Sequence, residues 1–263
     1  MIPYKIFPVF EIGPFHINMY GIMFSLAVIV AYVLAIKEAK KRNIEKKIIE
    51  ELIFYLLIGS IIGARIFYIM FHWPDSIPLT LFEAIAIWKG GLAFFGGILG
   101  ALAAGYIFIR KKKLNFWILA DILAIPIVVA HILGRLGDYL TGGHPGKVTS
   151  LPWGIFIEGT VRHPVVLYEI VGLIIILVIL LNLKKIQSKL NLFNGFVFSG
   201  YIILYSVQRI ILDFFRLESS EDPRFLGLTP TQYLSIVLFI LLIAFISISI
   251  KKNILTKKND KKY

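Results

Sequence analysis

Three arginines lie inside, or at the end of, strongly apolar stretches of this chain. Arg65 lies in "GARIFY", Arg135 in "HILGRLGD" and Arg209 in "QRIILDFFR". Arginine keeps its charge, and its planar guanidinium group matches the oxygens of a phosphate. Because ionisable groups at membrane depth are functional candidates by default, these residues predict a site for an anionic lipid headgroup. Each arginine alone could instead extend its charged end to the membrane surface, and Arg65 could form an internal ion pair.

An aspartate lies between two arginines in the last of these stretches. Arg209, Asp213 and Arg216 are spaced at i, i+4 and i+7, which places them on one face of a helix. Asp213 could therefore pair with either arginine and hold it in position for a phosphate. The alternative is a self-neutralised polar stripe that packs against another helix.

A glycine-rich polar segment follows Arg135 directly. Residues 135–165 contain six glycines, at positions 137, 142, 143, 146, 154 and 159. Glycine permits positive φ and close approach of the backbone, so the amides of such a loop can face a phosphate. The same glycines also suit ordinary turns, and those of "WKGGLAFFGGILGA" (88–101) suit close packing of two helices.

Seven apolar stretches must position these residues. About 20 apolar residues in a helix cross the roughly 30 Å hydrocarbon core, where only helices or closed barrels satisfy the backbone. One soluble core could not bury seven such helices in a chain of 263 residues that is 58% hydrophobic. The sequence therefore predicts an all-α, polytopic membrane protein with a single domain, residues 1–263. The predicted spans are residues 17–36, 50–71, 91–109, 116–134, 166–183, 195–215 and 232–250.

Positive charge is distributed unevenly along the chain, which has a net charge of +12. Four clusters hold 19 of the 28 lysines and arginines, and all four fall on one side of a seven-span chain: residues 37–47, 110–113, 184–189 and 251–262. The positive-inside rule then predicts an outside N-terminus and a cytoplasmic C-terminus. Membrane orientation and attraction to anionic lipid explain this charge distribution better than binding to nucleic acid does. Residues 251–263 are predicted to be a disordered, basic cytoplasmic tail.

With this topology, the polar residues of five spans gather in the outer half of the bilayer. Arg65 and Arg209 lie roughly 22 Å and 21 Å from the inner ends of their spans, at 1.5 Å per helical residue. The outer ends of the other spans carry Tyr20, Arg135, Tyr168 and Glu169. We therefore expect the three arginines to converge around one lipid headgroup on the extracytoplasmic side. The N-terminus lacks the basic region and cleavage site of a signal peptide, so we expect the first span to be retained.

An ordered set of short motifs resembles those of the prolipoprotein diacylglyceryl transferase family. The motifs are "NMYGIMF" (18–24), "GARIFY" (63–68), "WKGGLAFFGG" (88–97), "GRLGDYLTGGHPG" (134–146), "PWGIF" (152–156), "RHPVVLYE" (162–169), "RIILDFFR" (209–216) and "LTPTQYLS" (228–235). Each motif is weak by itself, but the set extends in order from the first span to the last. The resemblance implies a multi-pass enzyme of the bacterial plasma (inner) membrane that acts in lipoprotein maturation.

The resemblance also implies a reaction and its partners. The diacylglyceryl group of phosphatidylglycerol moves to the lipobox cysteine of a prolipoprotein signal peptide, and glycerol 1-phosphate leaves. The nucleophile belongs to the substrate, which agrees with a chain that has no cysteine. The enzyme would bind the phosphate, orient lipid against thiol and remove a proton.

By this resemblance, Arg135, Arg209 and Tyr20 match family residues and are the predicted catalytic residues. A fixed arginine beside the leaving phosphate would stabilise the charge that develops there. The predicted substrate-binding residues are Arg65, Asp138, Gly142, His144, Arg162, His163, Tyr168 and Glu169.

The chain departs from the family pattern near the expected site. Phe95 replaces the histidine of "FHGG", Asp138 replaces an asparagine, and Gly143 replaces the glutamate of "NGE". Asp138 would place a negative charge near the phosphate unless it pairs with Arg135 or takes up a proton. The lost groups include the family's candidate base, for which His131 or His144 could substitute. Val165 and Val166 also replace a serine and a glutamine.

Several functions remain open on the sequence alone. The first is the transferase reaction, and the second is a reaction of the same fold with another phospholipid or acceptor. The third is a lipid-binding membrane protein without catalysis. A channel or transporter would have enough spans, but the arginines crowd one leaflet and acidic groups at the midplane are absent. The histidines lack a metal-ligand spacing, so no metal or cofactor is expected.

Overall fold

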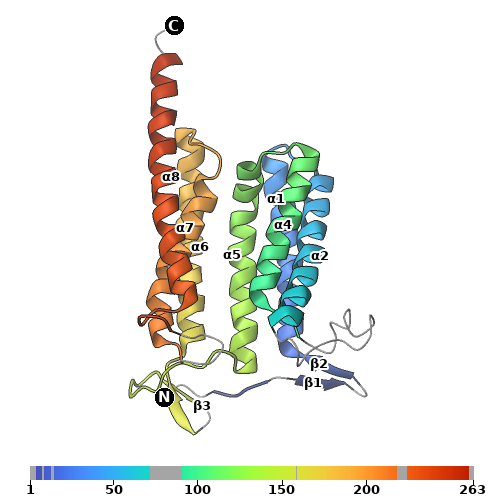
Figure 1. Ribbon diagram of the computed structural model, residues 1–263, viewed down its shortest axis with the longest axis vertical. Helices are drawn as coiled ribbons and strands as arrows, with labels where there is room; N and C mark the ends of the chain where they lie inside the picture. The colour runs from blue at the N-terminus through green and yellow to red at the C-terminus, as the bar shows by residue number, and fades with distance from the viewer. Residues whose placement is uncertain are drawn as a thin grey trace. The chain divides into compact units, whose positions relative to one another are not determined.

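Helices occur at all seven predicted spans. The computed structural model describes residues 4–7, 9–12, 15–71, 91–157, 159–217 and 224–260. The helices in Figure 1 are α1 (Met19–Lys41), α2 (Lys46–Phe71), α4 (Phe94–Lys112), α5 (Phe116–Thr141), α6 (Val165–Leu190), α7 (Phe196–Leu212) and α8 (Pro230–Asp260). Of the described helices, six are long and apolar enough to cross a membrane, with α7 counted together with the short helix that follows it. The predicted all-α polytopic membrane fold is therefore confirmed, and the orientation of the termini stays a prediction.

Contacts divide the chain into two compact units. The large unit comprises Met1–Leu34 and Trp117–Tyr263, and the small unit comprises Ala35–Phe116. Helix α1 therefore contributes its first part to the large unit and its last turns to the small one. Every charged residue of the site described below, apart from Arg65, belongs to the large unit.

Glycines allow α2 and α4 of the small unit to pack with their backbones in contact. Gly59 and Gly63 of α2 face Gly96 and Gly100 of α4, and a Cβ added at Gly63 would lie 2.8 Å from the Gly100 Cα. In lipid, helices are held together mainly by such close van der Waals contact, because water drives no apolar association there. The packing role that the sequence offered for these glycines is confirmed, although residues 88–90 of that motif lie outside the described residues.

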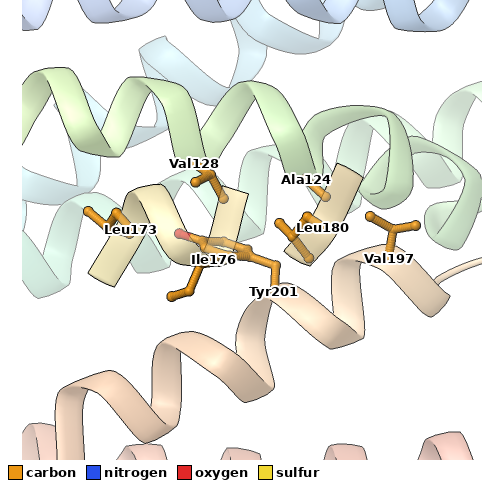
Figure 2. Packing of buried hydrophobic residues seen from close by; sticks show 7 residues of the cluster. All are labelled: Ala124, Val128, Leu173, Ile176, Leu180, Val197 and Tyr201. Atoms are coloured by element: carbon orange, nitrogen blue, oxygen red, sulfur yellow. The ribbon is translucent and has the colours of Figure 1, made fainter. Parts of the chain in front are cut away.

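The core of the large unit lies where α5, α6 and α7 meet, as Figure 2 shows. Its buried residues are Ala124 and Val128 of α5, Leu173, Ile176 and Leu180 of α6, and Val197 and Tyr201 of α7. Spacings of three and four place each set on one helical face. This packing fixes the separation of the three helices that carry Arg135, Glu169 and Arg209.

A buried aspartate ties the same three helices together at the opposite end of the bundle. Asp121 of α5 accepts hydrogen bonds from the backbone N–H groups of Gly195 at 2.8 Å and Phe198 at 2.9 Å. It also accepts one from the Gln187 amide of α6 at 2.6 Å. The first N–H groups of a helix have no partner within it and favour a negative charge. Asp121, which was not predicted from the sequence, therefore anchors the start of α7.

Helix α8 begins with a capping box. The Gln232 N–H donates to Thr229 Oγ1 at 3.2 Å, and the Thr229 N–H donates to Gln232 Oε1 at 2.9 Å. Pro230 occupies the first helical position, where its missing N–H has no intrahelical partner to lose. The helix continues to Asp260, so the prediction of a disordered tail from residue 251 is wrong up to that residue. A helix already formed in a span extends without a new nucleation step.

The connection between α5 and α6 is shorter and more regular than predicted. Helix α5 continues to Thr141, past the predicted end at residue 134. Strand β3 (Ile155–Ile157) pairs with β4 (Thr160–Arg162), and the Thr149 N–H donates to Val161 O on the other side of β4 at 2.9 Å. A second hairpin, β1 (Val9–Ile12) and β2 (Phe15–Asn18), precedes α1. After α7, the 3₁₀ helix η2 (Asp213–Phe215) contacts the connection between α5 and α6, because the Lys147 N–H donates to Phe215 O at 2.9 Å.

Candidate functional site

Two of the predicted arginines meet at one buried glutamate. Arg209 Nη1 donates to Glu169 Oε1 at 2.8 Å, and Arg135 Nε lies 2.6 Å from Glu169 Oε2. The side chains of Arg135, Arg209 and Glu169 are only 14%, 6% and 4% exposed. Neither arginine therefore extends to the surface. The two lie together, as their depth in the spans predicted, while their role stays a prediction.

Two more carboxylates flank the pair. Asp138 Oδ2 lies 2.9 Å from Arg135 Nη1, which resolves the conflict expected from a negative charge at this position. Asp213 Oδ1 lies 2.7 Å from Arg209 Nη2 and 3.7 Å from Arg216 Nη1, so Asp213 pairs with both arginines that the spacing suggested. The network thus holds three guanidinium groups and three carboxylates, and its formal charges balance.

The start of α8 completes the surroundings of Asp213. This residue is fully buried, and its Oδ2 accepts hydrogen bonds from Thr229 Oγ1 at 2.8 Å and Thr231 Oγ1 at 2.5 Å. Thr231 Oγ1 also lies 3.4 Å from Arg209 Nη2. Neither threonine was predicted from the sequence. The "LTPTQ" pattern marks a helix start, but only the packing of α8 against α7 brings its hydroxyl groups to Asp213.

Tyrosines of α7 separate His131 from the charged network. Tyr205 lies within electrostatic range of Arg135, and its ring lies edge-on to the His131 ring, with the ring centres 5.0 Å apart. His131 Nδ1 lies 3.4 Å from the Tyr201 hydroxyl oxygen. His131 is thus enclosed by core tyrosines, and its suggested role as a base stays a prediction.

His144 lies at the edge of the network, where solvent reaches it. Its Nδ1 is 2.9 Å from Arg216 Nη2, and its Nε2 is 4.0 Å from Asp138 Oδ1. Partial burial and the charges of Arg216, Arg135 and Arg209 lower the pKa of His144 to about 4. The imidazole is therefore neutral at neutral pH, with Nδ1 as an acceptor for Arg216, although the side chain is 46% exposed.

Tyr20 reaches the site from the start of α1. Gly137 of α5 provides the space, because a Cβ added there would lie 3.0 Å from Met23 Cβ and 3.4 Å from the Tyr20 ring. Tyr20 is 43% exposed and lies within electrostatic range of Asp138 and Arg135. The structure therefore brings this predicted catalytic residue to the Arg135 side of the network.

Tyr168 and His163 form an aromatic cluster beside Glu169. Trp153 Nε1 donates to the Tyr168 hydroxyl at 2.7 Å, and His163 Nδ1 lies 3.3 Å from the same oxygen. The ring of Phe215 lies edge-on to His163 at 5.1 Å. These contacts brace the β3–β4 region against the first turn of α6, which carries Glu169.

Arg162 and Gly142 form hydrogen bonds with backbone groups of the connection between α5 and α6 and of the end of α5. Arg162 Nη1 donates to Gly146 O at 3.3 Å, and its buried Nε has no hydrogen-bond partner among the described residues. The N–H groups of Gly142 and Gly143 donate to Tyr139 O at 3.4 Å and Asp138 O at 2.9 Å. These two amides are therefore used within the chain, and the role of Gly142 in substrate binding stays a prediction. They satisfy the last carbonyl groups of α5, as residues after a helix commonly do.

Arg65 and Phe95 belong to the small unit. Arg65 Nη1 donates to Gly91 O at 3.0 Å, and its guanidinium group lies 5.6 Å from the centre of the Tyr68 ring. Phe95, at the start of α4, is 49% exposed. The expected convergence of Arg65 with Arg135 and Arg209 stays a prediction.

The network suits an oxyanion better than a metal ion. Among the described residues, no group of three His, Asp or Glu side chains could hold a metal. A guanidinium group has five N–H donors, so Arg135 and Arg209 can each keep a carboxylate contact and still donate to phosphate oxygens. Such bonds are strong in a site this poorly exposed to water.

Comparisons with known proteins agree on one family. The sequence model of the prolipoprotein diacylglyceryl transferase family matches residues 8–248. A protein of Finegoldia magna named phosphatidylglycerol–prolipoprotein diacylglyceryl transferase is 35% identical over 253 residues, which cover 96% of this chain and 98% of that protein. Proteins of the same name from Listeria monocytogenes and Campylobacter lari are each 34% identical. The matches cover 90% and 93% of this chain, and 87% and 94% of those proteins.

Proposed function

Because the chain belongs to the prolipoprotein diacylglyceryl transferase family, we propose that it transfers the diacylglyceryl group of phosphatidylglycerol to the lipobox cysteine of a prolipoprotein signal peptide. We place this reaction at the outer face of the bacterial plasma membrane. The observation that carries the assignment of the site is the buried trio of Arg135, Glu169 and Arg209. It offers two fixed guanidinium groups to one phosphate.

The chemistry requires the site to stabilise a leaving phosphate. The acceptor sulfur attacks the carbon of the diacylglyceryl group that is esterified to the phosphate, so a C–S bond forms while the bond between that carbon and the phosphate oxygen breaks. The electron pair of that C–O bond goes to glycerol 1-phosphate, whose negative charge grows. Arg135 and Arg209 would be fixed donors for this charge, and such preorganised donors usually supply the largest part of catalysis.

The carboxylates keep the arginines in place until the lipid arrives. The guanidinium groups of Arg135 and Arg209 both contact Glu169, and without this carboxylate between them they would repel each other. Glu169 Oε2 and Asp213 Oδ1 have short ion-pair distances but no well-aligned hydrogen bond. We propose that phosphate oxygens replace these two contacts, while Glu169 Oε1 and Asp138 keep the guanidinium planes oriented.

We propose that His144 accepts the proton of the acceptor thiol. The imidazole is neutral, half-exposed and 4.0 Å from Asp138 through its Nε2, and Arg216 holds its Nδ1. A bound phosphate offsets the charge of the arginines, and this raises the pKa of His144 from about 4 toward its ordinary range. We propose that Tyr20 orients the lipid, and that Arg162, His163 and Tyr168 orient the acceptor.

A reconstituted assay tests this function. Full-length protein in vesicles containing phosphatidylglycerol should convert a lipobox peptide into its diacylglyceryl thioether, measured by mass. Arg135→Lys and Arg209→Lys should each lower kcat/KM about 100-fold or more. The single ammonium group of lysine cannot replace the planar set of N–H donors of a guanidinium group. Arg110→Lys, in a basic cluster outside the site, should leave the rate unchanged, and Phe95→Ala should retain activity.

The same assay separates the competing functions. A lipid-binding protein without turnover is favoured by one observation, the internal neutralisation of the arginines. It predicts saturable phosphatidylglycerol binding and no thioether with any lipobox peptide. Transfer from another phospholipid, or to another acceptor, would instead indicate a changed substrate on the same fold.

A further inference from the structure

A two-residue turn before α8 carries a leucine in a strained backbone position. Phe225 and Leu228 form an antiparallel bridge with N–H to oxygen contacts of 2.8 Å and 3.0 Å. Leu226 and Gly227 lie between them with φ angles of 49° and 81°, as the central residues of a type I′ turn require. Asparagine and glycine favour these positions, whereas leucine is disfavoured there.

The packing of the described residues does not compensate for this strain. The side chain of Leu226 is 99% exposed, and that of Phe225 is 60% exposed. One exposed leucine is ordinary on any protein surface. A leucine held at positive φ, next to an exposed phenylalanine at the tip of a turn, indicates an apolar partner outside the chain.

Hydrogen bonds hold the turn rigidly against the charged network. Arg224 Nη1 donates to Gly227 O at 3.3 Å, and Arg224 Nη2 donates to Asp213 O at 2.7 Å. The Tyr233 hydroxyl of α8 donates to Phe225 O at 2.7 Å. The turn is thus held at the carbonyl groups of Phe225 and Gly227, on either side of Leu226.

The turn also lies at the expected depth of a membrane boundary. Helix α8 begins at Pro230, and its exposed side chains include Leu234 and Val237, which are 51% and 52% exposed. The predicted apolar span within α8, residues 232–250, is about 29 Å long at 1.5 Å per residue, close to the roughly 30 Å hydrocarbon core. Tyr233 is a residue type enriched at membrane interfaces. The apolar tip therefore continues the lipid-facing surface of α8.

We propose that Phe225 and Leu226 form a membrane wedge, which inserts into the interfacial layer of the bilayer beside the start of α8. The partner is the lipid surface itself. The inference rests on the membrane-spanning fold and on the geometry of the turn. It does not depend on the proposed reaction.

The absence of cysteine in this chain makes the proposal directly testable. Leu226→Cys in the full-length protein creates a unique thiol, which is labelled with bimane and reconstituted into phosphatidylglycerol-containing vesicles. Two further variants give reference values for the quenching. Ile240→Cys, 60% exposed on α8, represents a label in the hydrocarbon core. Ser150→Cys, exposed between α5 and α6, represents a label in water. At position 226 we expect quenching by lipid spin-labelled near its headgroup to be clearly stronger than at position 150, and iodide quenching to be about threefold weaker than at position 150.

Two results would overturn the wedge. One is a label at position 226 that iodide quenches as strongly as the label at position 150. The other is a label that lipid does not reach but that a lipobox peptide protects, which would make the acceptor peptide the partner. In Leu226→Asn, which suits positive φ, a label at Phe225→Cys should lose lipid quenching without a fall in the thermal midpoint. Unchanged lipid quenching there would also reject the role of Leu226.

Discussion

At the scale of single residues, Glu169 balances the charges of two buried arginines. Glu169→Ala would leave Arg135 and Arg209 without their shared partner, and breaking a buried ion pair typically costs about 3–5 kcal/mol. We expect a large fall in the thermal midpoint of the purified protein. The control is Glu50→Ala, because Glu50 is 41% exposed and pairs with Lys46 at the surface, where such pairs contribute about 0–1 kcal/mol. Equal effects of the two variants would contradict this account.

His144 should give the stability of the protein a measurable pH dependence. Partial burial and the guanidinium charges of Arg216, Arg135 and Arg209 lower its pKa to about 4 in the folded chain, against about 6.5 in an unfolded chain. Between about pH 6.5 and 4 the unfolded chain binds a proton that the folded chain does not, so stability falls as the pH falls. His144→Asn, which suits the φ of 54°, should lose less thermal stability than the parent from about pH 7 to 4.5. Parallel losses would show that His144 does not titrate in this way.

The sequence predicted those parts of the site that local spacing determines. The i, i+4 relation placed Asp213 next to Arg209, and the apolar context of Arg135 and Arg209 indicated that they are buried. The sharing of Glu169 and the contact of Thr231 with Asp213 depend on how α5, α6, α7 and α8 pack. Packing between helices distant in sequence leaves no local pattern, so those contacts required the structure.

At the scale of helices, backbone contact between α2 and α4 depends on the absence of side chains at Gly59, Gly63, Gly96 and Gly100. A Cβ at Gly100 would collide with Gly59 O and lie 2.9 Å from the Gly63 Cα. We expect Gly100→Ala to separate the helices and lower the thermal midpoint. In Gly134→Ala the added Cβ has no atom within 4 Å, so this control should be neutral or gain up to about 1 kcal/mol, because alanine is the better helix former. A Gly100→Ala protein as stable as the control would reject the close-packing account.

Helix positions were predictable from hydropathy, but several helix ends were not. Hydropathy located every span because lipid requires long apolar helices. It placed the end of α5 at residue 134, whereas the helix continues through Asp138 to Thr141. The polar side chains of this last part are satisfied by Arg135 and by the carbonyl groups of the preceding turn. Polarity alone therefore does not mark the end of a membrane helix when a polar site lies there.

At the scale of the whole molecule, the distribution of positive charge predicts which side of the membrane holds the site. Anionic lipid attracts each basic residue near the cytoplasmic surface by about 1 kcal/mol, and the clusters at residues 37–47, 110–113, 184–189 and 251–262 hold most of the lysines and arginines. We expect Ser150→Cys in intact cells to react with a membrane-impermeant maleimide. Asn194→Cys, which is exposed between α6 and α7, should react only after permeabilisation, and the cysteine-free parent should not react. The reverse pattern would place Arg135 and Arg209 near the cytoplasmic leaflet and exclude an acceptor that is modified outside.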